Sequence, residues 1–345
     1  MNSKVYINGR FLTQNITGVQ RFALEICKEL IKLRDDVVFL VPSSFNERFA
    51  PQGFNIEIVG KKDGLYWEQV ELPRFLNKHG APLLISLCNR APLFYQNNIL
   101  VLHDITFIRY PESFSRAFLV LYKFLVPKLI KKAKKVLTVS DFSRREIADY
   151  YKVNYENIDI IYNAVSDQFF PANKEHGGYF LAVSSDVYNK NFERLILAFN
   201  QLTNSSRVKL KVVGRAGVMT NKYSNNANIE FVGRVCDDEL IKLYQNAIAF
   251  IFPSIYEGFG IPPLEAQACG CPVLSSDVTA MPEVLAESVY YFNPLDINDI
   301  TQKIAHIETN DQLRNELIQK GFNNVKRFSW NSSAKKLVDI YNSIR

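Results

Sequence analysis

The sequence lacks the short motifs that mark several large enzyme classes. It contains no G-x-x-x-x-G-K-[ST] loop, which argues against P-loop nucleotide hydrolysis, and no G-x-S-x-G elbow, which argues against hydrolase chemistry of the α/β type. No two aspartates are spaced as D-x-D, a common arrangement for a divalent metal, and no His/Cys cluster has metal-ligand spacing. We therefore expect no metal ion and no resident cofactor.

Cysteine is scarce, and long apolar runs are missing. Five scattered cysteines, an odd number, indicate a reducing compartment: Cys27, Cys88, Cys236, Cys269 and Cys271. Cys269 and Cys271 form a C-x-C pair without a second ligand pair, which favours two small buried residues over a metal site. No apolar stretch is long enough to span a membrane, and the first residues have no apolar core of a signal peptide. These features predict a cytoplasmic protein.

Positive charge is concentrated in one segment. Residues 109–145 contain ten Lys or Arg and only two acids, Glu112 and Asp141, and the same segment is apolar between its charges. One interpretation is a basic amphipathic helix that binds an anionic membrane surface. The other is a helix packed on its own sheet with a solvated basic edge. No nucleic-acid-binding motif accompanies the charge, so we expect no nucleic-acid partner.

Buried strands and amphipathic helices alternate along the chain, twice. We predict strands at residues 4–8, 37–41, 56–59, 83–87, 99–102, 135–139 and 158–162, and then at 179–183, 208–213 and 229–232, in an apolar run that begins at residue 249, and at 272–274 and 288–292. We predict helices from residue 19 to the Asp35–Asp36 break and at residues 114–133, 140–151, 192–202, 237–247, 297–328 and 330–344. The alternation is typical of doubly wound parallel sheets, so the fold class is α/β with two domains. A cleft between two such domains is a natural substrate site.

The stretch at residues 249–276 has the densest set of functional signals. A buried strand leads into a loop with Glu257, Gly258 and Gly260, and Pro262 then begins a short helix that carries Glu265. Such a helix N-terminus suits a phosphate group. Glu257 and Glu265 are open to three interpretations: an acid/base pair of a glycosidase, carboxylates that bind sugar hydroxyls beside a phosphate, or acids satisfied by local amides.

Three further positions are candidates for chemistry. His103 follows a predicted strand, where catalytic groups of α/β sheets gather, and it either contacts a sugar or is structural. Lys190 precedes a helix in the second half and either neutralises a diphosphate or is a surface lysine. Gly18 opens the first helix, so its N–H can approach a ligand, and Arg21 follows one turn later.

The chain resembles the retaining GT-B glycosyltransferases of family 4, also called glycosyltransferase group 1. The resemblance is carried by residues 252–265, which look like the family's E-x7-E signature, and by Gly270, residues 272–273 and residues 282–284. Residues 229–233, 139–143 and 161–165 also match, and the opening 7–26 is similar to members that build bacterial O-antigen or capsule.

The resemblance implies a GT-B fold: two Rossmann-like domains with parallel sheets facing an interdomain cleft. An acceptor domain would cover residues 1–165 and be joined by a crossing helix at 330–345, and a donor domain would cover residues 172–328. Lys190 would bind the donor diphosphate, and Glu257 would lie near the transferred sugar. Glu265 would bind the ribose, and His103 would lie at the reactive face of the sugar.

The resemblance also implies further donor contacts. They would come from Gly18, Ser184, Gly233, Arg234, Gly258, Phe259 and Gly260. Many relatives have an arginine where this chain has Ser184, so Lys190 would carry more of the diphosphate charge, with Arg194 or Arg215 as substitutes.

These observations predict a metal-independent retaining glycosyltransferase, peripheral at the inner face of the cell membrane. It would use a nucleotide-sugar donor and a lipid-diphosphate-linked saccharide acceptor. We expect a UDP-N-acetylhexosamine donor, with GDP-mannose or a dTDP-sugar as alternatives. The rival hypotheses are a GT-B-fold sugar-nucleotide epimerase, which needs no lipid-facing surface, and a non-catalytic nucleotide-sugar-binding or membrane-scaffold protein.

Overall fold

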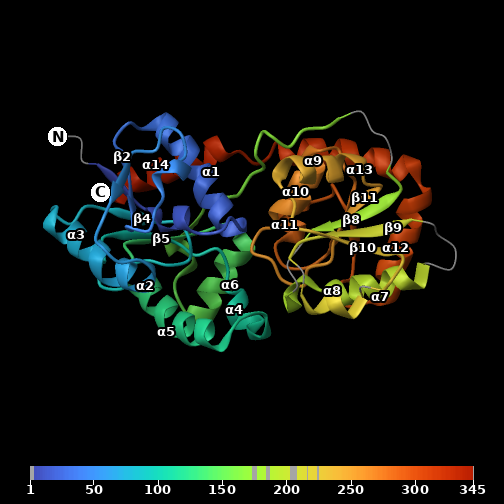
Figure 1. The fold of residues 1–345 in the computed structure, drawn as a ribbon, viewed down its shortest axis with the longest axis horizontal. Coiled ribbons are helices and arrows are strands. Elements are labelled where there is room, and N and C mark those ends of the chain that lie inside the picture. The colour runs from blue at the N-terminus through green and yellow to red at the C-terminus, as the bar shows by residue number, and fades with distance from the viewer. Residues whose placement is uncertain are drawn as a thin grey trace. The chain divides into compact units, whose positions relative to one another are not determined.

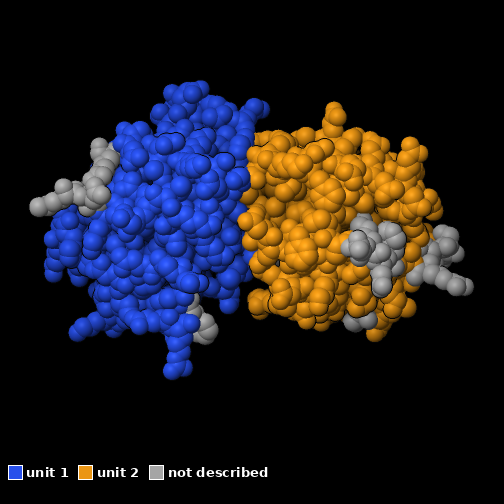
Figure 2. Space-filling model, turned by 90° about the horizontal axis from the view of Figure 1, so that it is seen from above, with its two compact units in different colours: residues 1–108, 114–163, 329–345 blue, residues 109–113, 164–328 orange. Residues whose placement is uncertain are grey.

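The chain divides into two compact units, which Figure 2 shows in different colours. The computed structural model describes residues 4–172, 177–183, 187–202, 208–215, 217–223 and 225–344. Unit 1 comprises Met1–Ile108, Phe114–Asn163 and Ser329–Arg345, and unit 2 comprises Arg109–Ser113 and Ala164–Phe328. The last segment of the chain therefore belongs to the first unit.

Unit 1 contains a seven-stranded sheet in which every pair of neighbours is parallel. Its strands, in spatial order, are β3 (Ile56–Ile58), β2 (Val37–Val41), β1 (Val5–Asn8), β4 (Leu84–Ser86), β5 (Asn98–Val101), β6 (Lys135–Thr138) and β7 (Ile158–Ile160). The central strands β1, β2, β4 and β5 are buried along their whole length. That burial explains why they appear in the sequence as continuous apolar runs.

Helices cover both faces of this sheet (Figure 1). They are α1 (Gly18–Leu33), α2 (Gly64–Tyr66), α3 (Leu72–Lys78), α4 (Thr106–Arg109), α5 (Arg116–Lys132), α6 (Asp141–Tyr151) and α14 (Trp330–Ile344). The C-terminal helix α14 packs on α1, where Phe22 and Trp330 make an edge-to-face contact at 5.9 Å between ring centroids. Ser140 begins α6 by accepting a hydrogen bond from the Ser143 N–H at 3.0 Å, as its sequence predicts.

Unit 2 repeats the architecture with six parallel strands. In spatial order they are β10 (Ile229–Gly233), β9 (Lys209–Val213), β8 (Tyr179–Val183), β11 (Ala249–Phe252), β12 (Val273–Ser276) and β13 (Tyr290–Phe292). Its helices are α7 (Phe192–Leu202), α8 (Val218–Tyr223), α9 (Asp237–Asn246), α10 (Ile261–Ala268), α11 (Met281–Leu285), α12 (Ile297–Thr309) and α13 (Asp311–Val325). The predicted class, α/β with two parallel sheets, is confirmed.

One helical segment of unit 1 has no counterpart in the sequence prediction. Residues 64–78 form α2, a π-helical turn at Trp67–Glu71, and α3. Pro73 stands near the start of α3 and conceals the helical period of the short segment. Trp67 is fully buried there, and its indole N–H donates to the Val59 carbonyl at 2.8 Å.

Each sheet has a point where the strand order reverses. In unit 1 it lies between β1 and β4, and in unit 2 between β8 and β11. Loops that leave neighbouring strands on opposite faces open a crevice at such a point, and ligands of open α/β sheets bind there. Of the helices described, none is both long and apolar enough to cross a membrane.

Candidate functional site

The loop between β11 and α10 in unit 2 carries the predicted donor signature. Gly260 precedes α10 with φ of +87°, a conformation that side-chain-bearing residues rarely adopt. A Cβ atom at this position would lie 2.6 Å from Met281 Cε. The backbone conformation therefore favours glycine here, and a side chain would also force Met281 to move.

The N-terminus of α10 offers fewer N–H groups than a typical helix. Pro262 and Pro263 lie in its first turn and have no N–H. Of the first four residues of α10, only Ile261 and Leu264 have an N–H. The expected backbone contribution to a diphosphate therefore has to come largely from the preceding loop, which contains Gly258 and Phe259.

Lys190, in the loop after β8, and Glu257, in the loop after β11, form an ion pair. Lys190 Nζ lies 2.5 Å from Glu257 Oε1, and both side chains are only partly exposed. The sequence suggested separate roles for the two, one on the diphosphate and one on the sugar. In the structure they neutralise each other, so an anion that binds Lys190 competes with the Glu257 carboxylate.

Two asparagines hold this lysine in place. The Asn189 side chain donates to the Tyr256 carbonyl at 3.1 Å, and the Asn191 side chain donates to the carbonyls of Pro253 and Pro294 at 3.0 and 2.7 Å. Asn191 also has a φ of +60°, a left-handed conformation that asparagine tolerates better than most residues. The sequence analysis missed both residues, although the order Asn-Lys-Asn at a strand-to-helix turn was a usable signal.

Glu265 lies inside unit 2. It is buried on α10, and the Tyr244 hydroxyl is 3.4 Å from its Oε2. Burial raises the pKa of Tyr244 well above its ordinary value, with the Glu265 charge adding to the effect, so the phenol stays protonated and can donate. Glu257 and Glu265 thus have different environments, one beside a cation and one beside a phenol.

The other predicted donor residues are spread over unit 2. Gly233 ends β10 with φ of +84°, and Arg234 follows it on the surface. Arg194 donates to the Asn191 side chain at 2.7 Å, and Arg215 is exposed after β9. Ser184, the position of the expected arginine, lies outside the described residues. No group of three or more His, Cys, Asp or Glu side chains in the described ranges is arranged to hold a metal ion.

His103 is buried in unit 1, directly after β5. Its Nε2 lies 2.9 Å from the Leu87 carbonyl, and its ring packs edge-on against Phe22 at 4.7 Å between centroids. A carbonyl only accepts, so in the neutral ring the proton is on Nε2 and Nδ1 is an acceptor. Burial lowers the pKa of His103, which favours the neutral ring. In the predicted contact with a sugar, His103 Nδ1 would therefore accept a hydrogen bond from a hydroxyl group.

Gly18 is the first residue of α1 and is exposed, and a Cβ atom placed on it would have no heavy atom within 4 Å. Its preceding residue, Thr17, makes no side-chain cap to the helix. The hydroxyl of Thr17 bonds to the Gln20 side chain instead. The first N–H groups of α1 are therefore not capped by Thr17.

The comparisons with known proteins decide the family. The model described as Glycosyl transferases group 1 matches residues 163–324, and that described as Glycosyltransferase Family 4 matches residues 16–169. The chain is 33% identical over 283 residues to the O-antigen chain mannosyltransferase RfbU of Salmonella typhimurium, covering 78% of each chain. The chain belongs to this glycosyltransferase family.

Two further relatives extend over nearly the whole glycosyltransferase. O-antigen chain mannosyltransferase B of Escherichia coli is 26% identical over 94% of this chain and 96% of its own. The crystal structure of Anabaena HepE in complex with UDP and glucose has a TM-score of 0.75 at 17% identity, over 99% of this chain and 100% of that one. The second comparison shows the fold, and the predicted GT-B fold is confirmed.

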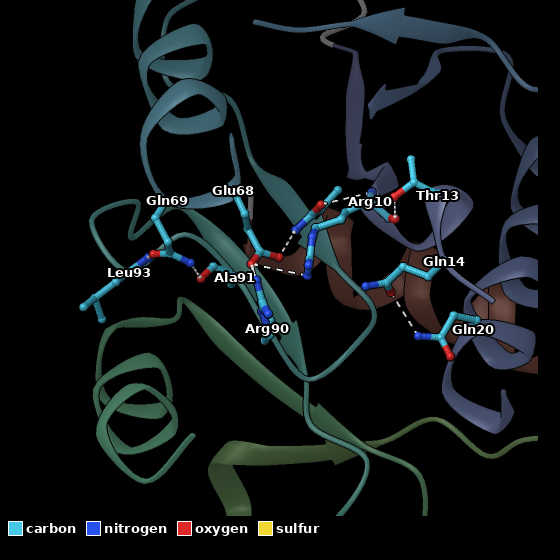
Figure 3. A network of polar contacts seen from close by, with 10 residues as sticks. Arg10, Thr13, Gln14, Gln20, Glu68, Gln69, Arg90, Ala91 and Leu93 are labelled. Atoms are coloured by element: carbon cyan, nitrogen blue, oxygen red, sulfur yellow. Dashed lines mark hydrogen bonds and ion pairs between the residues drawn. The ribbon is translucent and has the colours of Figure 1, made fainter. Parts of the chain in front are cut away.

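A charged cluster in unit 1 of the glycosyltransferase was missed by the sequence analysis. Glu68, on the π-helical turn, is bonded by Arg90, which follows β4, and by Asn8, which ends β1, and Arg10 lies close by (Figure 3). Arg10 follows β1 and Arg90 follows β4, the two strands between which the strand order reverses. His103 was predicted from the sequence because it also follows a strand. The strand-end rule, applied to every charged residue, would have found both.

Proposed function

We propose that this glycosyltransferase transfers mannose from GDP-mannose to a lipid-diphosphate-linked saccharide during O-antigen assembly. The observation that supports mannose is the similarity, over at least 78% of both chains, to two proteins named as O-antigen chain mannosyltransferases. The sequence favoured an N-acetylhexosamine from a UDP donor. These relatives point away from that sugar and toward one of the alternatives named with it.

The donor is proposed to bind in unit 2, at the crevice between the β8 and β11 loops. Lys190 would exchange its contact with Glu257 for the diphosphate, since phosphate oxygens carry more charge than one carboxylate. Glu257, released from the lysine, would then accept hydrogen bonds from the sugar hydroxyls. Glu265 would bind the ribose, and the loop at Gly258, Phe259 and Gly260 would contact the phosphates and sugar.

The reaction is proposed to retain the anomeric configuration and to need no metal ion. As the bond to the sugar breaks, negative charge grows on the leaving diphosphate and the sugar becomes oxocarbenium-like. Lys190 would stabilise that growing charge, an effect worth about 10²–10³ in rate for one well-placed donor. His103 would accept a hydrogen bond from a sugar hydroxyl through Nδ1.

The enzyme is proposed to work at an anionic membrane surface. Helix α5 buries Tyr122, Leu125, Val126, Leu129 and Ile130 against unit 1, and its outer face exposes Val120 and Phe124 together with lysines. Lys128 Nζ lies 3.1 Å from the centroid of the Phe124 ring. Both sequence interpretations of this segment are therefore compatible with one helix, which packs on its sheet and still presents apolar and basic groups outward.

A donor panel tests the proposal. The purified chain is given GDP-mannose, UDP-N-acetylglucosamine or a dTDP-sugar with a synthetic lipid-diphosphate disaccharide, and products are followed by mass spectrometry. We expect transfer only from GDP-mannose, undiminished by EDTA, and an α-linked product from the α-configured donor by NMR. Transfer from UDP-N-acetylglucosamine alone would refute the mannose assignment, and a β-linked product would refute retention.

A further inference from the structure

Two cavities in unit 1 adjoin each other at the carboxyl ends of its strands. The inner cavity measures about 410 Å³, and its lining includes Arg10, Glu68, Arg90, Phe118 and Tyr122. The outer cavity measures about 720 Å³, and its lining includes Asn15, Ser44, Asn46 and Asp63. Arg10 and Gln14 line both cavities, so the two spaces share a wall. Each volume suits a ligand of one or two rings.

The inner cavity has one cation whose donors the protein leaves unused. Glu68 is 2% exposed, and its carboxylate is occupied by Arg90, which donates Nε at 2.8 Å, and by the Asn8 side chain at 3.2 Å (Figure 3). Arg10 Nη1 lies 3.9 Å from Glu68 Oε2, too far for a hydrogen bond. Within the described part of the chain, the Arg10 guanidinium donates no hydrogen bond.

The local charge is therefore positive and incompletely compensated. Two guanidinium groups face one carboxylate, which leaves one net positive charge at the cavity. Burial lowers the pKa of Arg10; the Glu68 charge opposes this shift and the Arg90 charge adds to it, so the Arg10 pKa stays below its ordinary value and an added negative charge would be favourable there. An anionic oxygen in the inner cavity would provide that charge and accept the unused N–H groups.

Part of the lining of the inner cavity is aromatic. Phe114, Phe118 and Tyr122 stack in sequence, with ring centroids 4.9 and 3.9 Å apart and nearly parallel planes. All three line the cavity. Because Phe118 is stacked on both faces, the rings present mainly their apolar C–H edges, which can pack against the C–H groups of a pyranose ring. A cavity lined by aromatic side chains and an arginine thus fits a sugar ring next to an anionic group.

The outer cavity has a different chemistry. Its polar side chains are mostly amides and hydroxyls, and its one carboxylate, Asp63, is opposite in sign to Arg10 on the shared wall. In the described structure, neither the Asn15 amide nor the Asp63 carboxylate forms a side-chain hydrogen bond. Such groups bind the hydroxyls of a neutral sugar and disfavour a second anion.

We propose that the two cavities form one acceptor site for two consecutive sugar residues. The inner cavity takes a pyranose that carries or adjoins a phosphate or carboxylate, bound by Arg10, and the outer cavity takes a neutral sugar, bound by Asn15 and Asp63. The site rests on the proposed function in one respect, that the acceptor is a saccharide. The glycosyltransferase then selects acceptors by length and by charge, and a neutral monosaccharide is a poor acceptor.

Binding of small saccharides to the full chain tests the site without any transfer reaction. The probes are mannobiose 1-phosphate, mannobiose, mannose 1-phosphate and mannosyl-glucuronic acid, titrated by calorimetry. We expect mannobiose 1-phosphate to bind at least about tenfold more tightly than mannobiose or mannose 1-phosphate, as one hydrogen bond to a charged group predicts. Mannosyl-glucuronic acid separates the two sources of charge: tight binding assigns the anion to an acidic sugar, and weak binding assigns it to a phosphate.

Variants separate the two cavities. Arg10→Gln removes the advantage of the charged probes over mannobiose, and Arg10→Lys restores part of it. Asn15→Ala with Asp63→Ala removes the advantage of the disaccharide phosphate and leaves mannose 1-phosphate unchanged. Arg74→Gln, an exposed arginine of α3 in the same unit, is the matched control and changes neither. Equal affinities of the wild type for charged and neutral probes, or an Arg10→Gln variant that binds like the wild type, would overturn the proposal.

The proposed function is checked on the same protein by titration with GDP-mannose. If GDP-mannose does not bind while the probes follow the expected pattern, the donor assignment fails and the acceptor site stands. If GDP-mannose binds and mannose is transferred while the probe pattern is absent, the acceptor site alone fails.

Discussion

The Lys190 ammonium lies 2.5 Å from the Glu257 carboxylate, and the two residues come from loops 67 positions apart in the chain. The pair has no net charge, so each member controls how the other meets a ligand. Replacing Glu257 and replacing Lys190 are therefore expected to change the KM for the donor in opposite directions.

Glu257→Gln is expected to lower the KM for the donor and to lower kcat at the same time. The substitution leaves Lys190 without its competing carboxylate, which favours diphosphate binding. It also replaces one of the two acceptor oxygens for the sugar hydroxyls by an amide NH2 and removes the negative charge beside the reacting sugar. Lys190→Ala is expected to raise KM and to reduce kcat/KM by about 100-fold, because it removes the cation opposite the leaving group. Steady-state kinetics with the active donor measure both, and Lys242→Ala on the exposed surface of α9 serves as a comparison. A higher KM for Glu257→Gln would contradict the competition between carboxylate and diphosphate.

His103 predicts a pH dependence of stability. Its pKa is lowered in the folded protein below the ordinary 6.5 of an unfolded chain, so below pH 6.5 the unfolded state binds the proton more readily. The contribution of the neutral ring to stability is thus full above pH 6.5 and is lost as the pH falls from there through the folded pKa. Urea unfolding at pH 7.5 and pH 5.5 should show a larger stability difference between wild type and His103→Gln at the higher pH. An equal difference at both values would refute a buried neutral histidine.

Trp330 at the start of α14 is expected to stabilise unit 1, although 165 residues of unit 2 separate it from the preceding segment of unit 1. Trp330→Ala removes a buried ring that packs on Phe22 and is expected to cost about 3–5 kcal/mol. The indole N–H has no hydrogen-bond partner in the described structure, so Trp330→Phe loses no bond, leaves a smaller cavity and is expected to cost clearly less than Trp330→Ala. Chemical unfolding monitored by circular dichroism measures both values. Similar losses of unfolding free energy in the two variants would show that packing of the ring on Phe22 does not account for the stability that Trp330 contributes.

Membrane binding is expected to depend on the outer face of α5. Lys123, Lys128 and Lys131 are exposed there, and each lysine near an anionic surface contributes about 1 kcal/mol. Reversing all three to Glu should weaken binding to phosphatidylglycerol-containing vesicles by at least about 100-fold, as three such contributions predict. The same reversal at the exposed Lys242, Lys326 and Lys336 is the control for net charge. If the control variant loses as much binding, the attraction is not specific to α5.

The fold was largely predictable because parallel strands buried on both faces appear as short apolar runs. Strand β8 and helix α7 have the predicted bounds, as do β2 and α14. The segment at residues 64–78 was not predictable in the same way, because Pro73 and a π-helical turn interrupt its period. Glu68, the central residue of the charged cluster of unit 1, lies in that segment. The cluster was therefore not predicted from the sequence.

The site was predictable in composition and less so in arrangement. Glu257, Lys190 and the glycine loop stand out from the sequence, whereas the ion pair between Lys190 and Glu257 depends on two loops brought together by the β8–β11 pairing. The anchoring of Lys190 by Asn189 and Asn191 depends on carbonyls of distant loops, for which no side-chain pattern exists. The proposed roles of the predicted residues, and the domain limits predicted with them, stay predictions.

The position of α14 affects how the protein is made. Unit 1 begins the chain, but its helix α14 lies in the final segment, Ser329–Arg345. Domains generally fold as units during synthesis, beginning with the N-terminal one. Here the first unit to leave the ribosome lacks the helix that packs on α1 until residues 330–344 have been translated, and its surface at Phe22 stays uncovered until then. The unit that is translated first is therefore the one that is completed last.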